Sequence, residues 1–176
     1  MRKHLAWVLC TLIIVSCNDK DDKETTATTS NEPQQAVFAD PKFTELGKKG
    51  ITSLSTGDLK DWIDGFADNA VYYWNNGDSL KGKAAITDYW TNRRKEAIDT
   101  MMISNQIWLP VTVNKAQANE RTGNYLLCWY RVEAKYKTGK SMSQFIHTVL
   151  HFDTNDKIDF VSQYLDRVPI NAAMTK

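Results

Sequence analysis

Two runs of β-branched and aromatic residues near the end of the chain constrain its fold most strongly. They are Phe145–Phe152 and Ile158–Arg167, and the Asp/Asn cluster Asp153–Asp156 separates them. Two such runs around a turn-forming cluster predict a long antiparallel hairpin. The hairpin carries two histidines and a late aspartate, and we expect it to form the floor of a pocket.

Two earlier runs alternate between apolar and polar residues with a period of two, which is typical of strands with one buried face. In the first, apolar residues from Met101 to Val113 alternate around one polar position, Asn105. The buried face predicted for the second consists of Leu126, Cys128, Tyr130, Val132, Ala134 and Tyr136. Ala70–Trp74 predicts a further, shorter strand.

Three segments before the long strands have helical spacing. Asp40-Pro41 is a typical helix start, and the apolar residues from Phe43 to Leu54 recur at helical intervals. Leu59–Phe66 predicts a short second helix, and Lys83–Asp99 predicts a third. Helices on one face of a curved sheet give an α+β fold with a hollow between the layers. We expect a curved, mixed or antiparallel sheet of about four to six strands.

The N-terminus predicts export and lipid anchoring. A short basic start precedes an apolar run, Leu5–Val15, of the length found in signal peptides. The run ends in Ser16-Cys17, which resembles a bacterial lipobox. We therefore expect residues 1–16 to be a signal peptide and Cys17 to carry the lipid. The alternative is an ordinary secretory signal with a chance cysteine.

The polar composition of residues 17–39 predicts a disordered tether, which leaves residues 40–176 as the folded domain. The expected location is the bacterial outer membrane, on its periplasmic side or at the cell surface, with Cys17 providing the membrane attachment. A formal net charge of +1 gives no electrostatic reason to expect nucleic acid as a partner.

Three segments resemble the SnoaL-like branch of the nuclear transport factor 2 superfamily. Ser55–Val71 is similar to the opening of that family, Asp78–Ile86 to the entry of its third helix, and Asp156–Asp166 to its ending. The resemblance implies a cone-shaped pocket between the helices and the concave sheet face. It implies no single activity, because the fold hosts isomerases, cyclases, dehydratases, hydrolases and binding proteins. In the ketosteroid-isomerase branch a base aspartate ends the first strand, and Trp74 stands near that position here, which argues against that mechanism.

His147 and Asp166 are the candidate catalytic residues. Asp166 is placed similarly to the acid/base aspartate that SnoaL-type cyclases carry on the last strand. His147 could act with it, since imidazole titrates near neutral pH and a carboxylate in reach fixes its tautomer. The alternatives are a surface or cap role for Asp166, and for His147 a half-buried strand position with a backbone or tyrosine partner.

Five aromatic residues are the candidate ligand-binding residues, with few polar groups among them, as in most sites for small molecules. They are Trp74, Trp90, Trp108, Tyr130 and Tyr164. Three functions follow as hypotheses. The chain could bind a small, mostly apolar molecule, it could be an isomerase, cyclase or hydrolase that uses His147 and Asp166, or it could be a dimerisation scaffold without a ligand. A homodimer is compatible with all three, because relatives often pair through the exposed sheet face.

No metal or cofactor is expected. His147 and His151 share one face of a predicted strand but stand roughly 13 Å apart at about 3.3 Å per residue, which is too far for joint ligation of one ion. The sequence has no nucleophile elbow, phosphate-binding glycine loop or paired-cysteine motif. Cys128 is expected to be a small buried hydrophobe, with a nucleophile as the alternative.

Overall fold

The computed structural model describes residues 33–175. The expected signal peptide, Cys17 and most of the expected tether lie outside the described residues. Within residues 33–175, no helix combines the length and the apolar character that a membrane span needs.

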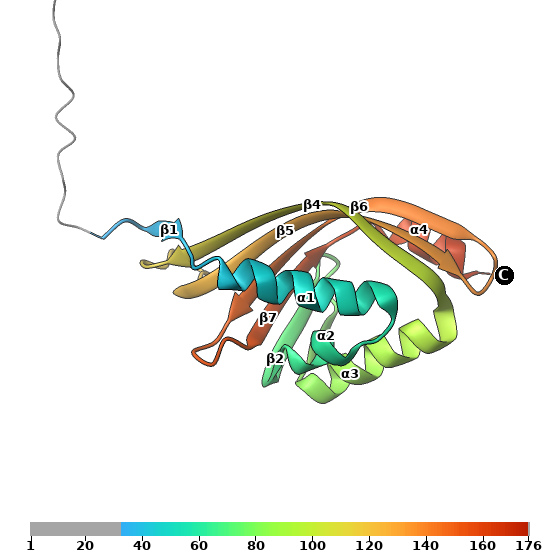
Figure 1. Cartoon of the computed structure of the whole chain (residues 1–176), viewed down its shortest axis with the longest axis horizontal. Helices are drawn as coiled ribbons and strands as arrows, with labels where there is room; N and C mark the ends of the chain where they lie inside the picture. Colours follow the sequence, from blue (N-terminus) through green and yellow to red (C-terminus); the bar gives the residue numbers. More distant parts are fainter. Residues whose placement is uncertain (1–32, 176) are drawn as a thin grey trace, which may run out of the picture. The chain divides into compact units, whose positions relative to one another are not determined.

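The domain contains one curved sheet and several helices, as predicted (Figure 1). In chain order the elements are β1 (Ala36–Phe38), α1 (Lys42–Thr56), α2 (Lys60–Asp64), β2 (Phe66–Trp74), β3 (Ser79–Lys81), α3 (Lys83–Asn92), the π-helical turn η1 (Arg93–Ala97), β4 (Ile98–Val113), β5 (Gly123–Tyr136), β6 (Ser141–Phe152), β7 (Ile158–Tyr164) and α4 (Arg167–Met174).

The sheet has seven strands in the order β1-β4-β5-β6-β7-β2-β3, more than the four to six expected. The parallel pair β2–β7 makes it mixed, and all other neighbours are antiparallel. The unexpected strands β1 and β3 have three residues each, too few to show a period of two. Residues 36–38 lie in the segment expected to be a tether, yet they pair with Val111–Val113 at the edge of the sheet.

The helices α1, α2 and α3 lie on the concave side of the sheet (Figure 1). Helix α1 packs closely over β4 and β5, and glycine makes this possible. A Cβ atom at Gly47 would lie 2.3 Å from Leu126 Cδ2, closer than real contacts allow, and 3.1 Å from Trp108 Cζ3, which is a tight contact. Gly57 ends the helix with φ of 88°, a conformation that favours glycine.

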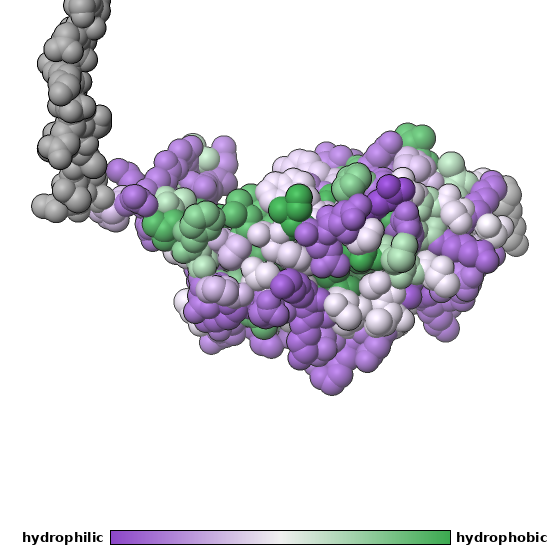
Figure 2. All heavy atoms as spheres, turned by 45° about the horizontal axis from the view of Figure 1, so that its top comes forward, coloured by the Kyte–Doolittle hydropathy of each residue, from purple (hydrophilic) through white to green (hydrophobic). Residues whose placement is uncertain are grey.

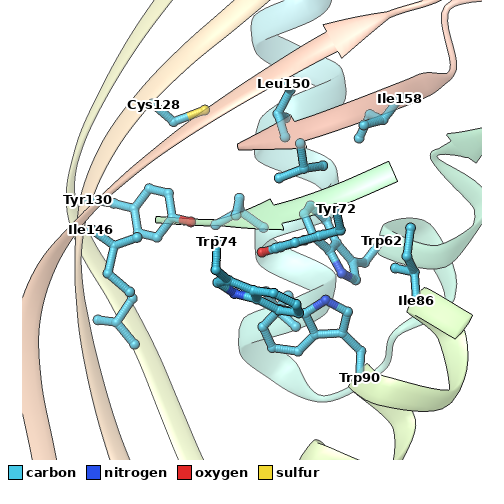
Figure 3. Close-up of a cluster of buried hydrophobic side chains, with 14 of the residues drawn as sticks. Trp62, Tyr72, Trp74, Ile86, Trp90, Cys128, Tyr130, Ile146, Leu150 and Ile158 are labelled. Atoms are coloured by element: carbon cyan, nitrogen blue, oxygen red, sulfur yellow. The ribbon is translucent and has the colours of Figure 1, made fainter. Parts of the chain in front are cut away.

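The buried face predicted for β5 is confirmed, because all six residues from Leu126 to Tyr136 are buried. They face an aromatic cluster contributed by α2, β2 and α3. In Figure 3 the rings of Trp62, Tyr72, Trp74 and Trp90 lie together, with Tyr130 on the opposite wall. Period-two burial therefore identifies the inner wall of the domain.

The alternation predicted for β4 is wrong beyond Asn105. The register with β5 shifts between Ser104 and Ile107, and Asn105 adopts a left-handed φ of 51°. A bulge of this kind inserts residues without a partner and moves the following side chains to the other face. Met101 accordingly faces the inner side opposite Ala134, whereas Ile107 pairs with outward-facing Trp129 and is 62% exposed.

Two further differences concern helices. The third predicted helix ends earlier than expected, because it becomes the π-helical turn η1 at Arg93 and β4 begins at Ile98. Helix α4 was not predicted. Asp166 begins it, since its side chain accepts a hydrogen bond from the Val168 backbone N–H at 2.8 Å.

Candidate functional site

A cavity of about 80 Å³ lies between the concave sheet face and helices α1, α3 and α4. Apolar and aromatic side chains from these helices and from β2, β4, β5 and β6 form most of its wall. Its polar side chains are those of Arg93, Gln163, Arg167, Asn171 and three tyrosines. Such a wall is typical of a small-molecule site, although sites for drug-sized ligands are larger, at about 300–1,000 Å³. The cavity therefore suits a small ligand.

Three of the five aromatic residues predicted to bind a ligand line this cavity. Trp74 ends β2, Trp90 lies in the last turn of α3, and Tyr130 projects from the middle of β5. The rings of Trp74 and Trp90 both pack against Tyr89, with centroid distances of 5.1 Å and 5.3 Å. Each such ring pair contributes about 0.5–1.5 kcal/mol beyond the burial of its area, so the pairs stabilise this part of the wall.

The other two aromatic residues do not line the cavity. Trp108 follows the bulge of β4, and its ring packs against α1 at Gly47. Tyr164 points outward and is 52% exposed. On the outer face it stacks with His147, and His147 stacks with Trp129, at centroid distances of 5.8 and 4.5 Å. We call Trp129, His147 and Tyr164 the outer aromatic row.

His147 and Asp166 do not form a pair. His147 Nδ1 lies 3.0 Å from the Cys128 backbone oxygen, and its ring belongs to the outer aromatic row. Asp166 caps α4, and neither residue lines the cavity. The expectation that the closing hairpin presents these two residues to the pocket is therefore wrong. The inward positions of β6 and β7 are the alternate ones, such as Thr148 and Gln163.

A buried polar network at these inward positions was missed by the sequence analysis. Gln163 Oε1 accepts a hydrogen bond from Trp74 Nε1 at 3.1 Å. Gln163 Nε2 donates to Tyr130 Oη at 3.4 Å and to Thr148 Oγ1 at 3.3 Å. Tyr130 Oη and Thr148 Oγ1 share a further bond of 2.8 Å. Because Gln163 is held from several sides, the network fixes the orientation of Trp74 and Tyr130 in the wall. The sequence does contain one indication of this network, because Gln163 is a polar residue within a run rich in β-branched and aromatic residues.

A histidine–aspartate pair does exist, but on the outer face and between other residues. His151 Nδ1 lies 2.5 Å from Asp159 Oδ1, and its Nε2 lies 3.2 Å from the Thr122 backbone oxygen. Arg121 also bonds Asp159 at 3.4 Å. Asp159 and Arg121 border a shallow groove of about 820 Å³ along the outer sheet face. Both imidazole nitrogens of His151 therefore already have partners within the chain. Because one of these partners is the backbone oxygen of Thr122, the pair holds the loop before β5 in place.

The inner cavity offers little acid–base chemistry near neutral pH. Burial raises the pKa of Tyr130, and it raises the pKa of Tyr136, where nearby Arg93 partly opposes the rise. Both hydroxyls therefore stay protonated. Burial also raises the pKa of the Cys128 thiol, which keeps it a neutral, buried side chain. Among residues 33–175, no group of three or more His, Cys, Asp or Glu side chains could hold a metal ion.

Comparisons with known proteins show the fold. Neither a protein-family model nor a curated protein matches the sequence. Solved structures do match. A protein from Xanthomonas campestris pv. campestris, provisionally named a polyketide cyclase, has a TM-score of 0.60 at 14% identity, covering 76% of this chain and 97% of its own. An NTF2-like protein of unknown function from Burkholderia pseudomallei has a TM-score of 0.61 at 11% identity, covering 76% and 98%.

A third match includes a small ligand. It is a protein from Catenulispora acidiphila with a ketosteroid isomerase-like fold, in complex with trimethylamine. Its TM-score is 0.55 at 14% identity, and the match covers 74% of this chain and 92% of that one. At such identities the likeness concerns the fold.

Proposed function

We propose that this chain, which has the fold of the nuclear transport factor 2-like proteins, binds a small, mostly apolar molecule in its inner cavity. The observation that carries the proposal is the cavity itself, an apolar and aromatic space held open beside a fixed polar network. A core that serves stability alone is packed with few voids larger than a water molecule. The binding of trimethylamine by one protein of similar fold is consistent with a small ligand.

The enzyme hypothesis has less support in the geometry. It depended on His147 and Asp166 sharing the cavity, and they have separate partners outside it. In the part of the chain that the structure describes, no carboxylate or imidazole lines the cavity. A binding role needs neither group.

A ligand screen tests the proposal. The full-length protein is incubated with lipids, sterols and aromatic acids, and binding is read by thermal shift and native mass spectrometry. A ligand that binds only the folded state raises stability by RT ln(1 + [L]/Kd), which is about 2.7 kcal/mol at 100 times Kd. A complete lack of binders across all three classes contradicts the proposal.

We also propose that the protein is exported and anchored to a bacterial membrane through lipid on Cys17. The support is the sequence, with its signal-like apolar run and Ser16-Cys17. Cells expressing the full chain are expected to incorporate labelled palmitate into it, and Cys17→Ser is expected to abolish the label. Cys10→Ser, inside the same segment, is the matched control and should keep it. Equal labelling of both variants contradicts the anchor.

A second copy of this chain is the proposed partner for the outer sheet face. Large apolar side chains are exposed there, among them Ile107 and Tyr164, and Figure 2 shows apolar residues interspersed with hydrophilic ones on this side. Exposed apolar groups of this kind mark interaction surfaces when they lie together.

Ile107→Lys is therefore expected to shift the mass measured by light scattering from two chains to one, because it places a charge in the interface. Leu46→Lys makes the same change to a partly exposed apolar residue on the helical side, and should leave the dimer intact. A wild-type protein with the mass of one chain at all concentrations contradicts this prediction.

A further inference from the structure

Two residues that line the inner cavity carry buried hydrogen-bond donors without acceptors. The Nε1 atom of Trp90 and the Nε atom of Arg167 are buried and have no hydrogen-bond partner in the described part of the chain. Trp90 is only 6% exposed and lines the cavity. A buried donor without an acceptor costs about 1–3 kcal/mol. A bound molecule that supplies acceptor atoms removes this cost.

Arg93 adds an unpaired positive charge to the same cavity. It projects from η1, and its guanidinium carbon lies 5.8 Å from the centre of the Tyr89 ring. It donates a weak hydrogen bond to Met174 Sδ at 3.7 Å, and it also interacts with the Tyr136 hydroxyl. Among residues 33–175, no carboxylate oxygen lies within 4 Å of its nitrogens. The cation is half-buried and contacts an aromatic ring, a thioether sulfur and the neutral Tyr136 hydroxyl, none of which balances its charge.

Arg167 also lines the cavity, from the start of α4. One edge of its guanidinium faces outward, where Nη2 bonds Asn76 Oδ1 at 3.0 Å and lies 3.3 Å from Asp78 Oδ2. Its guanidinium carbon lies 5.4 Å from the centre of the Trp74 ring, and its Nε atom is buried. Asp78 therefore balances the charge of Arg167, whereas the charge of Arg93 stays unbalanced within this site.

The acceptors that line the cavity are neutral ones, namely the amide oxygens of Gln163 and Asn171 and the tyrosine hydroxyls. Gln163 Oε1 accepts from Trp74 Nε1, and within residues 33–175 no aspartate or glutamate lines the cavity. Two unpaired donors together with one arginine that has no carboxylate partner match a ligand with a single negative charge. A carboxylate fits best, because its two oxygens match the planar fork of a guanidinium.

We infer that the ligand is a small carboxylic acid, bound as its anion with the carboxylate at Arg93 and its apolar body among the aromatic rings. This inference rests on the proposed function and specifies the class of molecule. The volume of the cavity limits the size of the apolar part of the ligand. At about 10–15 Å³ for each water-sized sphere, 80 Å³ holds about six of them, which suits a single ring or a short chain.

Three probes of nearly equal shape test the inference on the full-length protein. They are benzoate, benzamide and benzylamine, which at pH 7 are an anion, a neutral amide and a cation. Their dissociation constants are measured by calorimetry at one ionic strength. Benzoate is expected to bind about tenfold to a hundredfold more tightly than benzamide, because hydrogen bonds to a charged group are stronger than neutral ones.

Substitutions locate the effect at Arg93. Arg93→Met keeps the length and apolar stem of the side chain, and is expected to bring benzoate and benzamide to within about threefold of each other. Arg93→Lys keeps the charge without the fork, and should give an intermediate preference. Arg131→Met is the matched control. Arg131 lies on β5 and pairs with Glu133 at 3.0 Å, away from the cavity, so the benzoate preference should persist.

The outcomes separate the inference from the proposed function. Equal binding of benzoate and benzamide, or a preference for benzylamine, overturns the carboxylate inference and leaves apolar binding in place. A benzoate preference that persists in Arg93→Met overturns the role of Arg93. Failure of all three probes, together with failure of the wider ligand screen, overturns both proposals.

Discussion

Replacing Trp62 with alanine is expected to lower the free energy of unfolding by about 3–5 kcal/mol. Trp62 is 2% exposed and joins three elements. Its ring meets Phe66 at 4.9 Å and Trp90 at 6.2 Å, both edge-to-face, and it lies directly under Gly50 of α1. Alanine leaves a large cavity that these rigid neighbours do not fill. Urea unfolding monitored by circular dichroism measures the change.

Phe145→Ala is the matched control, because it also removes an aromatic ring from an ordered element. Phe145 lies on β6 and is 62% exposed, so its loss should change the free energy of unfolding by less than about 0.5 kcal/mol. Similar destabilisation by both variants means that Trp62 does not connect α2 to the core in the way the structure indicates.

Filling the inner cavity is expected to abolish ligand binding while the protein stays folded. Val132 projects from β5 into the cavity, and Val132→Phe places a ring in the space assigned to the ligand. Overpacking costs about 1–3 kcal/mol where a core is full, and free volume here reduces that cost. The ligand-dependent gain in stability, about 2.7 kcal/mol at 100 times Kd for the wild type, should disappear. Thermal shift with and without the ligand found by the screen measures it.

Val149→Phe makes the same substitution on the other side of the sheet. Val149 lies on β6 and faces the outer groove. This variant should bind the ligand with wild-type affinity. If Val149→Phe loses binding and Val132→Phe keeps it, the ligand occupies the outer groove and the proposed site is wrong.

Period-two patterning predicted those parts of the sheet where neither bulges nor short strands intervene. In β5 the pattern from Leu126 to Tyr136 corresponds fully to burial, because each side chain has a neighbour strand on both sides and a fixed register. In β4 the same reasoning failed at Asn105, since a bulge depends on pairing with β5 and leaves little trace in local composition. As a result of the bulge, Ile107 lies on the outer face of the sheet instead of the predicted inner face.

The candidate site was predicted less well than the fold. Residue type identified Trp74, Trp90 and Tyr130, because large rings on predicted buried faces line most hollows of this kind. It did not identify Arg93 or Arg167, which look like solvated charges in the sequence. Arg93 lies within the range predicted for the third helix, but in its π-helical turn η1, whereas α4, which carries Arg167, was not predicted.

The sequence by itself determined the α+β class, the inner face of β5 and the three helices on one side, because these follow from local periodicity and capping. The tertiary structure decided which side of the closing hairpin faces the cavity. A shift of one residue exchanges the two faces of a strand, so the same run could direct either His147 or Thr148 inward. Pairing with β5 and β7 selects Thr148, and it leaves both histidines on the outer side of the sheet.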